Sequence, residues 1–327
     1  MKIAVLMGGI GDEREVSLVT GQACADALAA EGFIVIPLDP APDTIDALVT
    51  AAAPDVVFNA LHGDWGEGGD VQAILDRIGV PYTHSSASAS RAAMHKTTAK
   101  RILEAADLTT AEERLLPRAE IARGGAMPTP YVVKPNGSGS SASVHLVMQE
   151  TPEILAKIAS DTELDPQALV ERYIPGRELT CAVMDGKAMA VTEIIPEGWY
   201  SYEEKYGAGA ARHVLPADIP STAYALCMAW AERAHTALGC SGLTRTDFRF
   251  DDTDLDVDNA SKTDMANRVV TLELNTQPGM TPTSLAPEQA AWVGLEFGEL
   301  CRWIVEDALC RDRQDLRRQV AERVRPQ

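Results

Sequence analysis

The chain has 327 residues, of which 46% are hydrophobic and 24% are charged, and its formal net charge is -19 at pH 7. This length exceeds what one small core organises, so we expect a globular protein of two or three subdomains. The acidity argues against a nucleic-acid partner, because neutralising phosphates requires concentrated Lys and Arg. Any anionic substrate must therefore meet a local basic pocket.

The location of the protein is suggested by what the sequence lacks. No apolar run approaches the length of a membrane span, so we expect no membrane partner. The start MKIAVLMGG has a short apolar stretch that ends in glycines, which is not typical of a signal peptide. The cysteines have no C-x-x-C spacing and indicate reduced core residues of a cytoplasmic protein. They are Cys24, Cys181, Cys227, Cys240, Cys301 and Cys310.

Residues 1–91 alternate between strand and helix patterns, which predicts an N-terminal open parallel α/β domain. The strands are KIAVLMGG, FIVIPLD and DVVFNALHG, and the helices between and after them are REVSLVTGQACADALAAEG and DVQAILDRIG. Ligands of such units gather in the loops that follow the strands. The loops of this kind are MGGIGDE and LHGDWGEGGD.

These two loops supply the first candidate site residues. Glu15 lies in the first turn of the predicted helix, where it is suited to hold an ammonium group or simply to complement the helix dipole. His62 ends a strand and is followed by Glu67, and a histidine in this place is either structural or substrate-binding. A dinucleotide fingerprint is disfavoured, because Arg14 occupies the position of its third glycine.

From residue 92 onward the pattern is α+β. A helix AAMHKTTAKRILEAA comes before the strand YVVKP, a glycine-serine loop, the strand SVHLV and a short helix at 152–160. The segment ALVERYIPGRELTCAVM predicts two strands around a Pro-Gly turn. The loop KPNGSGSS offers backbone N–H groups and hydroxyls for phosphate oxygens, with a plain hairpin turn as the structural alternative. Lys134, at the end of the preceding strand, is placed to reach the same phosphates.

The rest of the chain adds a strand AMAVTEII, a long loop that includes YSYEEKYGAGA, and a helix capped by Ser221 that runs to Gly239. Two strands, LTRTDFRF and RVVTLELN, then precede a final amphipathic helix and a charged tail. The insert DDTDLDVDNASKTD lacks the glycine and the bidentate glutamate of a calcium loop. We therefore predict a solvated hairpin tip there.

The last two predicted strands contain the strongest chemical signal. Residues two apart lie on one face of a strand, so Arg245 and Asp247 share a face, as do Glu273 and Asn275. Magnesium prefers a few protein oxygens together with substrate phosphates. The four residues therefore predict a site for metal-bridged ATP. A surface ion pair between neighbouring strands is the structural alternative.

Six motifs occur in order over nearly the whole chain: GGIGDEREVS, LHGDWGEGG, MHKTTAK, VVKPNGSGSS, RTDF and LELNTQPGMTPTS. Together they resemble the D-alanine:D-alanine ligases, which are ATP-grasp enzymes. The resemblance implies an α/β, three-domain ATP-grasp fold with the open parallel α/β substrate domain at 1–91, the central α+β domain at 92–186 and the catalytic and metal domain at 187–327. It also implies ATP-dependent ligation of two D-alanines through an acyl phosphate, for peptidoglycan precursor synthesis, by a homodimer.

The resemblance further implies a role for each site residue. Two Mg²⁺ ions, for which Mn²⁺ is a possible substitute, would be held by Asp247, Glu273 and Asn275. ATP would contact Lys96, Lys134, Ser140, Ser141, Glu171, Glu178 and Lys205. The D-alanines would contact Glu15, His62, Glu67 and Ser284. Catalysis would involve Glu15 with its partners Ser140 and Tyr206, and an oxyanion site made by Arg245 and the N–H of Gly279.

Two alternatives to this function stay open. Ala142-Ser143 follows the paired serines where the family has Val-Gly, and this change motivates a nucleotide-binding paralogue without ligase turnover. A D-alanine:D-lactate ligase is the other alternative. Depsipeptide makers tend to lose the tyrosine of the EKY motif, and Tyr206 is present, so the dipeptide product is favoured.

Overall fold

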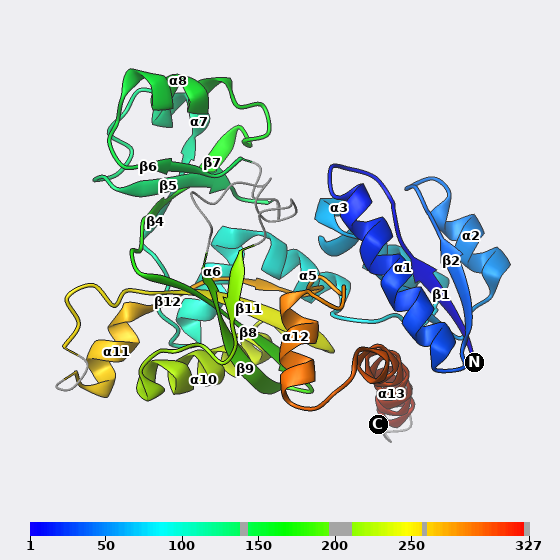
Figure 1. Cartoon of the computed structure of the whole chain (residues 1–327). Helices are drawn as coiled ribbons and strands as arrows, with labels where there is room; N and C mark the ends of the chain where they lie inside the picture. The colour runs from blue at the N-terminus through cyan, green and yellow to red at the C-terminus, as the bar shows by residue number, and fades with distance from the viewer. Residues whose placement is uncertain (138–142, 196–210, 257–259, 324–327) are drawn as a thin grey trace.

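The computed structural model describes residues 1–137, 143–195, 211–256 and 260–323. Within these ranges the strands form three sheets, which Figure 1 shows in different parts of the molecule. The parallel sheet of the N-terminal unit has the order β2-β1-β3. Two antiparallel sheets follow, one of four strands in the order β4-β7-β5-β6 and one of five in the order β10-β9-β8-β11-β12.

The N-terminal unit is an open parallel sheet, as the sequence predicts. Its elements are β1 (Lys2–Leu6), α1 (Arg14–Ala30), β2 (Ile34–Leu38), α2 (Ile45–Ala52), β3 (Val56–Asn59), α3 (Gly63–Glu67) and α4 (Asp70–Ile78). Every residue of β3, and all of β1 but its first, is buried, which is typical of parallel strands covered on both faces. Leu6 lies opposite Asn59, so the loops after β1 and β3 leave the sheet at the same edge.

Two helices, α5 (Ala87–Met94) and α6 (Lys96–Ala105), stand where the sequence predicts one. The break is at His95, which has an extended backbone. Asn136 explains it, because its carbonyl accepts from the N–H of Lys96 and its side chain accepts from the N–H of Thr97. These are N–H groups of a first helical turn, which need partners outside the helix.

The four-stranded sheet comes next and carries two helices on one face (Figure 1). Its elements are β4 (Glu113–Pro117), α7 (Arg118–Ile121), β5 (Tyr131–Pro135), β6 (His145–Val147), α8 (Pro152–Ser160) and β7 (Gln167–Arg172). Tyr131 and Val133 of β5 pack with Ile121 and Ile158 of the helices in one apolar cluster. This sheet therefore has its own core.

The five-stranded sheet contains the predicted metal residues. Its elements are β8 (Arg177–Met184), β9 (Lys187–Ile195), β10 (Arg212–Val214), α10 (Ser221–Ala237), β11 (Leu243–Phe250), α11 (Lys262–Arg268), β12 (Val269–Asn275), α12 (Leu285–Trp292) and α13 (Phe297–Arg323). Trp230 and Ala231 of α10 pack with Phe248 and Leu179 of the strands. Gln289 of α12 bonds the backbone of β8.

Helix α13 returns to the N-terminal unit. Leu300 and Ile304 share one apolar cluster with Cys24 and Leu28 of α1 and with β1 and β3. Figure 1 shows α13 beside the N-terminal unit. The helix thus completes the core of an N-terminal unit that lies far from it in the sequence.

Strands β7 and β8 flank the predicted Pro-Gly turn but do not pair with each other. β7 pairs with β4 and β5, whereas β8 pairs with β9 and β11, so this connection passes from one sheet to the other. The predicted limit at residues 186 and 187 lies between β8 and β9, which pair within one sheet. The division into three domains stays a prediction.

Three local predictions need correction. Ser221 is the first residue of α10, and the N-cap position is Pro220, which has no side-chain oxygen. The connection from β11 to β12 is more than a hairpin tip, because it contains α11, whose start is fixed by a capping box of Ser261 and Asp264. The cysteines are unpaired, but Cys310 is exposed and so is not a core residue.

The described helices include none with the length and apolar character that crossing a membrane requires.

Gly176 allows a test of the connection between the two antiparallel sheets. Its φ is +87°, and a Cβ there would lie 2.1 Å from the carbonyl oxygen of Phe250. Gly186 is the matched control, since its φ is +68° and its Cβ would have open space. We expect Gly186→Ala to lower the free energy of unfolding by about 1–2 kcal/mol, because its backbone is left-handed. Gly176→Ala should lower it further, because its Cβ also meets the carbonyl of Phe250. Urea denaturation of both variants measures the difference, and equal losses would contradict this account.

Candidate active site

Strands β11 and β12 bring the predicted metal residues together. Arg245 lies opposite Asn275, and Asp247 lies opposite Glu273. Arg245 donates from Nε and Nη2 to the two oxygens of Asp247, at 2.9 and 2.8 Å. Asn275 Nδ2 donates to Asp247 Oδ2 at 3.0 Å, and Thr180 Oγ1 of β8 donates to Oδ1 at 2.6 Å. The carboxylate of Asp247 is therefore held by three neighbouring side chains.

The donor set of this strand pair fits a hard cation. Asp247 and Glu273 offer carboxylate oxygens and Asn275 an amide oxygen, which are ligands that Mg²⁺ prefers. The side chains of Asp247 and Glu273 are 14% and 28% exposed, and each carboxylate already faces a cation. Lys96 Nζ lies 3.6 Å from Glu273 Oε2. Asn275 would coordinate through its oxygen after a half-turn of the amide.

A chain of buried charges joins the predicted nucleotide residues. Lys134 Nζ of β5 lies 2.5 Å from Glu171 Oε2 of β7. The other oxygen of Glu171 accepts from Lys100 Nζ of α6 at 2.8 Å. Lys100 is not among the predicted site residues, although its spacing of four from Lys96 in MHKTTAK places both lysines on one helical face. That spacing is the signal that could have found it.

Burial and neighbouring charges have opposite effects on the pKa values of these buried residues. Burial raises the pKa of Glu171, but the charges of Lys134 and Lys100 and their hydrogen bonds outweigh it, so the pKa is lowered overall. Burial lowers the pKa of Lys134, but Glu171 and Glu273 outweigh it, so this pKa is raised. For Lys96 burial is the larger effect, and its pKa is lowered despite Glu273. Lys134 and Glu171 therefore hold each other in the charged state.

The remaining predicted residues of the antiparallel sheets lie in two places. Glu178 of β8 has Oε2 3.8 Å from Arg249 Nη1. Ser284 occupies the N-cap position of α12 without a side-chain capping hydrogen bond, and its Oγ lies 2.7 Å from Thr281 Oγ1. A Cβ on Gly279 would lie 3.2 Å from Ser284 Oγ, so these two residues are neighbours.

A second cluster lies at the edge of the parallel sheet, where the loops after β1 and β3 meet. Ligand atoms of Glu13, His62 and Glu67 all lie within 4.8 Å of one another. His62 Nδ1 is 2.8 Å from Glu67 Oε1, and His62 Nε2 is 3.2 Å from Thr20 Oγ1 of α1. His62 is only 8% exposed. The cluster places two carboxylates around one buried imidazole.

Glu15, predicted for this cluster, lies on the exposed face of α1. Glu13 is the carboxylate beside His62. Glu13 is the N-cap residue that precedes α1, whereas Glu15 lies in the first turn of the helix. The motif GDEREVS contains both glutamates, and its letters alone do not say where the first helical turn begins.

The two clusters are close to each other. Gln277, in the loop after β12, donates from Nε2 to the carbonyl of Leu61 beside His62. The charge of Arg245 also acts on His62 and opposes its protonation. Gln277 is a further residue that the sequence prediction missed. The predicted residues Ser140, Ser141, Lys205 and Tyr206 lie outside the described residues.

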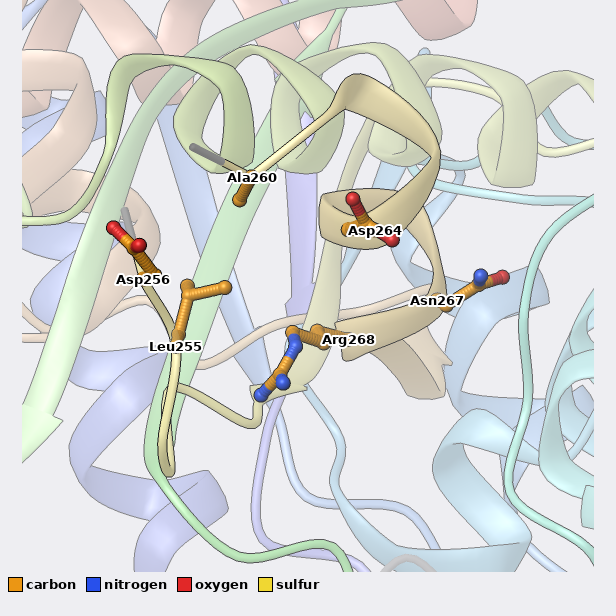
Figure 2. Close-up of a pocket in the computed structure, with 6 residues that line it drawn as sticks. All are labelled: Leu255, Asp256, Ala260, Asp264, Asn267 and Arg268. Atoms are coloured by element: carbon orange, nitrogen blue, oxygen red, sulfur yellow. The ribbon is translucent and has the colours of Figure 1, made fainter. Parts of the chain in front are cut away.

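A hollow on the connection between β11 and β12 is separate from these clusters. Figure 2 shows its lining, and its volume is about 330 Å³. The lining residues are Leu255, Asp256, Ala260, Asp264, Asn267 and Arg268. Of the described residues, none predicted for the site lines it. Arg268 donates to the carbonyls of Asp251 and Thr253 in the same connection, and these hydrogen bonds fix the conformation of the loop.

Residues 103–306 match the family described as D-ala D-ala ligase C-terminus, and this match covers more than half of the chain. The chain belongs to the D-alanine–D-alanine ligase family. The D-alanine–D-alanine ligase of Dinoroseobacter shibae is 52% identical over 309 residues, which cover 94% of this chain and 96% of that one. The ligase of Acidiphilium cryptum is 48% identical, with coverages of 95% and 99%.

Solved structures of the D-alanine–D-alanine ligase family share the fold. The ligase of Bacillus anthracis superposes with a TM-score of 0.77 at 28% identity and covers 96% of this chain and 99% of its own. The same ligase complexed with ATP gives 0.76 at 27% identity, with the same coverages. The predicted ATP-grasp α/β class is therefore confirmed.

His62 gives a test of the cluster at the edge of the parallel sheet. Burial opposes the charged imidazole, but the hydrogen bond and charge of Glu67 and the charge of Glu13 outweigh it, so the pKa of His62 is raised. A raised pKa stabilises the folded protein below about pH 6.5, and this stabilisation is lost as the pH rises through the folded-state pKa. We expect Glu67→Gln to lower the pKa of His62, measured by NMR titration of the imidazole.

His235 of α10 is the internal control for this titration. Burial lowers its pKa to about 4, and Glu67 is not among the charges acting on it. Its titration should be the same in both proteins. An unchanged pKa of His62 in the Glu67→Gln variant would contradict the proposed pairing.

Proposed function

We propose that this protein joins two D-alanines into D-alanyl-D-alanine, with ATP converted to ADP and phosphate. The observation that carries the proposal is the proximity of three groups, which are linked by the ion pair of Lys96 with Glu273 and by the hydrogen bond of Gln277 to Leu61 beside His62. They are the oxygen donors of β11 and β12, the buried lysines Lys96 and Lys134, and the cluster of Glu13, His62 and Glu67. The first two suit a nucleotide with its metal, and the third suits an ammonium group. Relatives named D-alanine–D-alanine ligase support the same activity.

Activation of the first D-alanine is the step that requires ATP. A carboxylate is a poor acyl donor, because an oxide would have to leave. Transfer of the γ-phosphoryl group to it gives an acyl phosphate with a good leaving group. Lys96 and Lys134 neutralise phosphate charge during the transfer. Mg²⁺, held by Asp247, Glu273 and Asn275, would add positive charge beside the same phosphates.

The substrates are oriented by residues from both clusters. Glu13 binds the ammonium of the first D-alanine, and Glu67 keeps His62 in place beside it. Ser284 anchors the carboxylate of the second D-alanine, whose amine attacks the acyl phosphate. Arg245 and the N–H of Gly279 stabilise the negative oxygen that develops on the attacked carbonyl. Arg245 is already fixed by its two bonds to Asp247, so little ordering is needed when the charge forms.

The setting of this reaction is part of the same proposal. The dipeptide is a precursor of peptidoglycan, and the enzyme acts in the cytoplasm as a homodimer. Glu171 and Glu178 bind the adenine and ribose end of ATP. Ser140, Ser141, Lys205 and Tyr206 keep the roles that the family resemblance implies.

Phosphate release tests the activity directly. With ATP and Mg²⁺, we expect release that depends on D-alanine and not on L-alanine, with the dipeptide identified by mass spectrometry. Nucleotide binding without D-alanine-dependent release would favour the paralogue without turnover. At pH 9 more of the D-alanine amine is deprotonated and able to attack, so a dipeptide ligase should prefer D-alanine as the acceptor. A D-lactate product that dominates at this pH would therefore favour the D-alanine:D-lactate ligase.

Glu13 and Glu15 form a matched pair for testing the ammonium site. We expect Glu13→Gln to lower kcat/KM for D-alanine by at least about thirtyfold, because a charged partner of the substrate is lost. Glu15→Gln removes the same charge from an exposed position and should leave kcat/KM within about twofold. Steady-state kinetics at varied D-alanine measures both. A larger effect at Glu15 would assign the ammonium to that residue instead.

A further inference from the structure

Lys100 is one of the most deeply buried charges of the described chain, at 1% exposure. Its ammonium group reaches three acceptors from different segments. Nζ donates to the carbonyl of Ala111 at 2.6 Å and to Glu171 Oε1 at 2.8 Å, and it lies 2.9 Å from Glu113 Oε2. The contacts to Ala111 and Glu171 are hydrogen bonds, whereas the contact to Glu113 is an ion pair. The ammonium group of Lys100 is therefore enclosed by acceptors of the protein itself.

Glu171 connects this buried lysine to the predicted nucleotide site. Its two oxygens are divided, with Oε1 bonded to Lys100 and Oε2 to Lys134. A carboxylate fixed through one oxygen by a rigid helix presents the other oxygen in one direction. Lys100 sits in α6, whereas Lys134 lies at the end of β5 just before the glycine-serine loop. The direction in which Lys134 is held thus depends on a residue of another element.

Two cations act on the buried carboxylate of Glu171. The side chain is 4% exposed, and burial of a lone carboxylate favours its neutral form. One lysine opposes that tendency, and here two lysines together outweigh it. Without Lys100, burial would act against Lys134 alone. Glu171 would then take up a proton more readily and lose its hold on Lys134.

We propose that Lys100 is a positioning residue for nucleotide binding: it keeps Glu171 charged and oriented, and Glu171 in turn holds Lys134 toward the phosphates of ATP. This inference rests on the proposed function for the roles of Glu171 and Lys134. Lys100 itself touches neither substrate nor metal. Its effect is transmitted through one shared carboxylate.

Direct binding of ATP with Mg²⁺, measured by calorimetry on the full chain without D-alanine, tests the proposal. We expect Lys100→Met to weaken ATP binding by about ten- to a hundredfold, since Glu171 loses one of its two cations and the hydrogen bond that orients it. The KM for D-alanine should change by less than about threefold in the same variant. Arg101→Ala is the matched control, because Arg101 is the exposed neighbour on α6 and should leave ATP binding unchanged.

Loss of stability must be separated from loss of positioning. Lys100→Met also leaves Glu113 without its cation, and the double variant Lys100→Met with Glu113→Gln removes that unpaired charge. We expect the double variant to regain thermal stability but to bind ATP as weakly as Lys100→Met. Glu113→Gln alone keeps the bond between Lys100 and Glu171 and should bind ATP like the wild type.

The dependence of binding on pH gives a readout that a purely structural lysine would not change. Between pH 8 and pH 5.5, we expect ATP binding by the double variant to weaken more steeply than that of the wild type, as Glu171 gains a proton. Wild-type affinity and pH dependence in the double variant would overturn the proposal. The ligase itself is judged separately, because ATP binding without D-alanine-dependent phosphate release would count against the ligase and not against the role of Lys100.

Discussion

The register of two antiparallel strands sets the conditions for the whole site. β11 and β12 place Asp247 directly opposite Glu273, and like charges in that position destabilise a strand pair. The protein offsets this repulsion with Arg245 on one carboxylate and Lys96 on the other. The resulting arrangement is a pair of anions already surrounded by positive charge. The charges of Asp247 and Glu273 are therefore already neutralised by Arg245 and Lys96 before a metal ion arrives with ATP.

A similar balance extends from the five-stranded sheet to the four-stranded one. Glu171 and Lys134 belong to the four-stranded sheet, and the charge of Glu273 in the other sheet acts on Lys134. Helix α6 lies along both, with Lys96 directed to Glu273 and Lys100 to Glu171. The two lysines are four residues apart on one helix. The spacing between the nucleotide residues and the metal residues is therefore fixed in part by one turn of α6.

Much of the fold could be predicted from local patterns, because strand and helix periods depend on neighbouring residues. The features that the sequence did not predict depend on distant partners. The break at His95 requires Asn136, and the separation of β7 from β8 requires strands that lie elsewhere in the chain. At the site, residue types and motif order indicated the chemistry. The choice between Glu13 and Glu15 instead depends on where α1 begins, and the place of Lys100 depends on packing between α6, β4 and β7.

Helix α13 has a consequence for how the protein is made. Cys24 and Leu28 of α1 are covered by Leu300 and Ile304, which leave the ribosome about 270 residues later. At about 5–20 residues per second, that delay is on the order of tens of seconds. During this time the parallel sheet has its strands but lacks part of the apolar cover of one face. The nascent chain thus carries an exposed apolar surface on its parallel sheet until α13 has been synthesised.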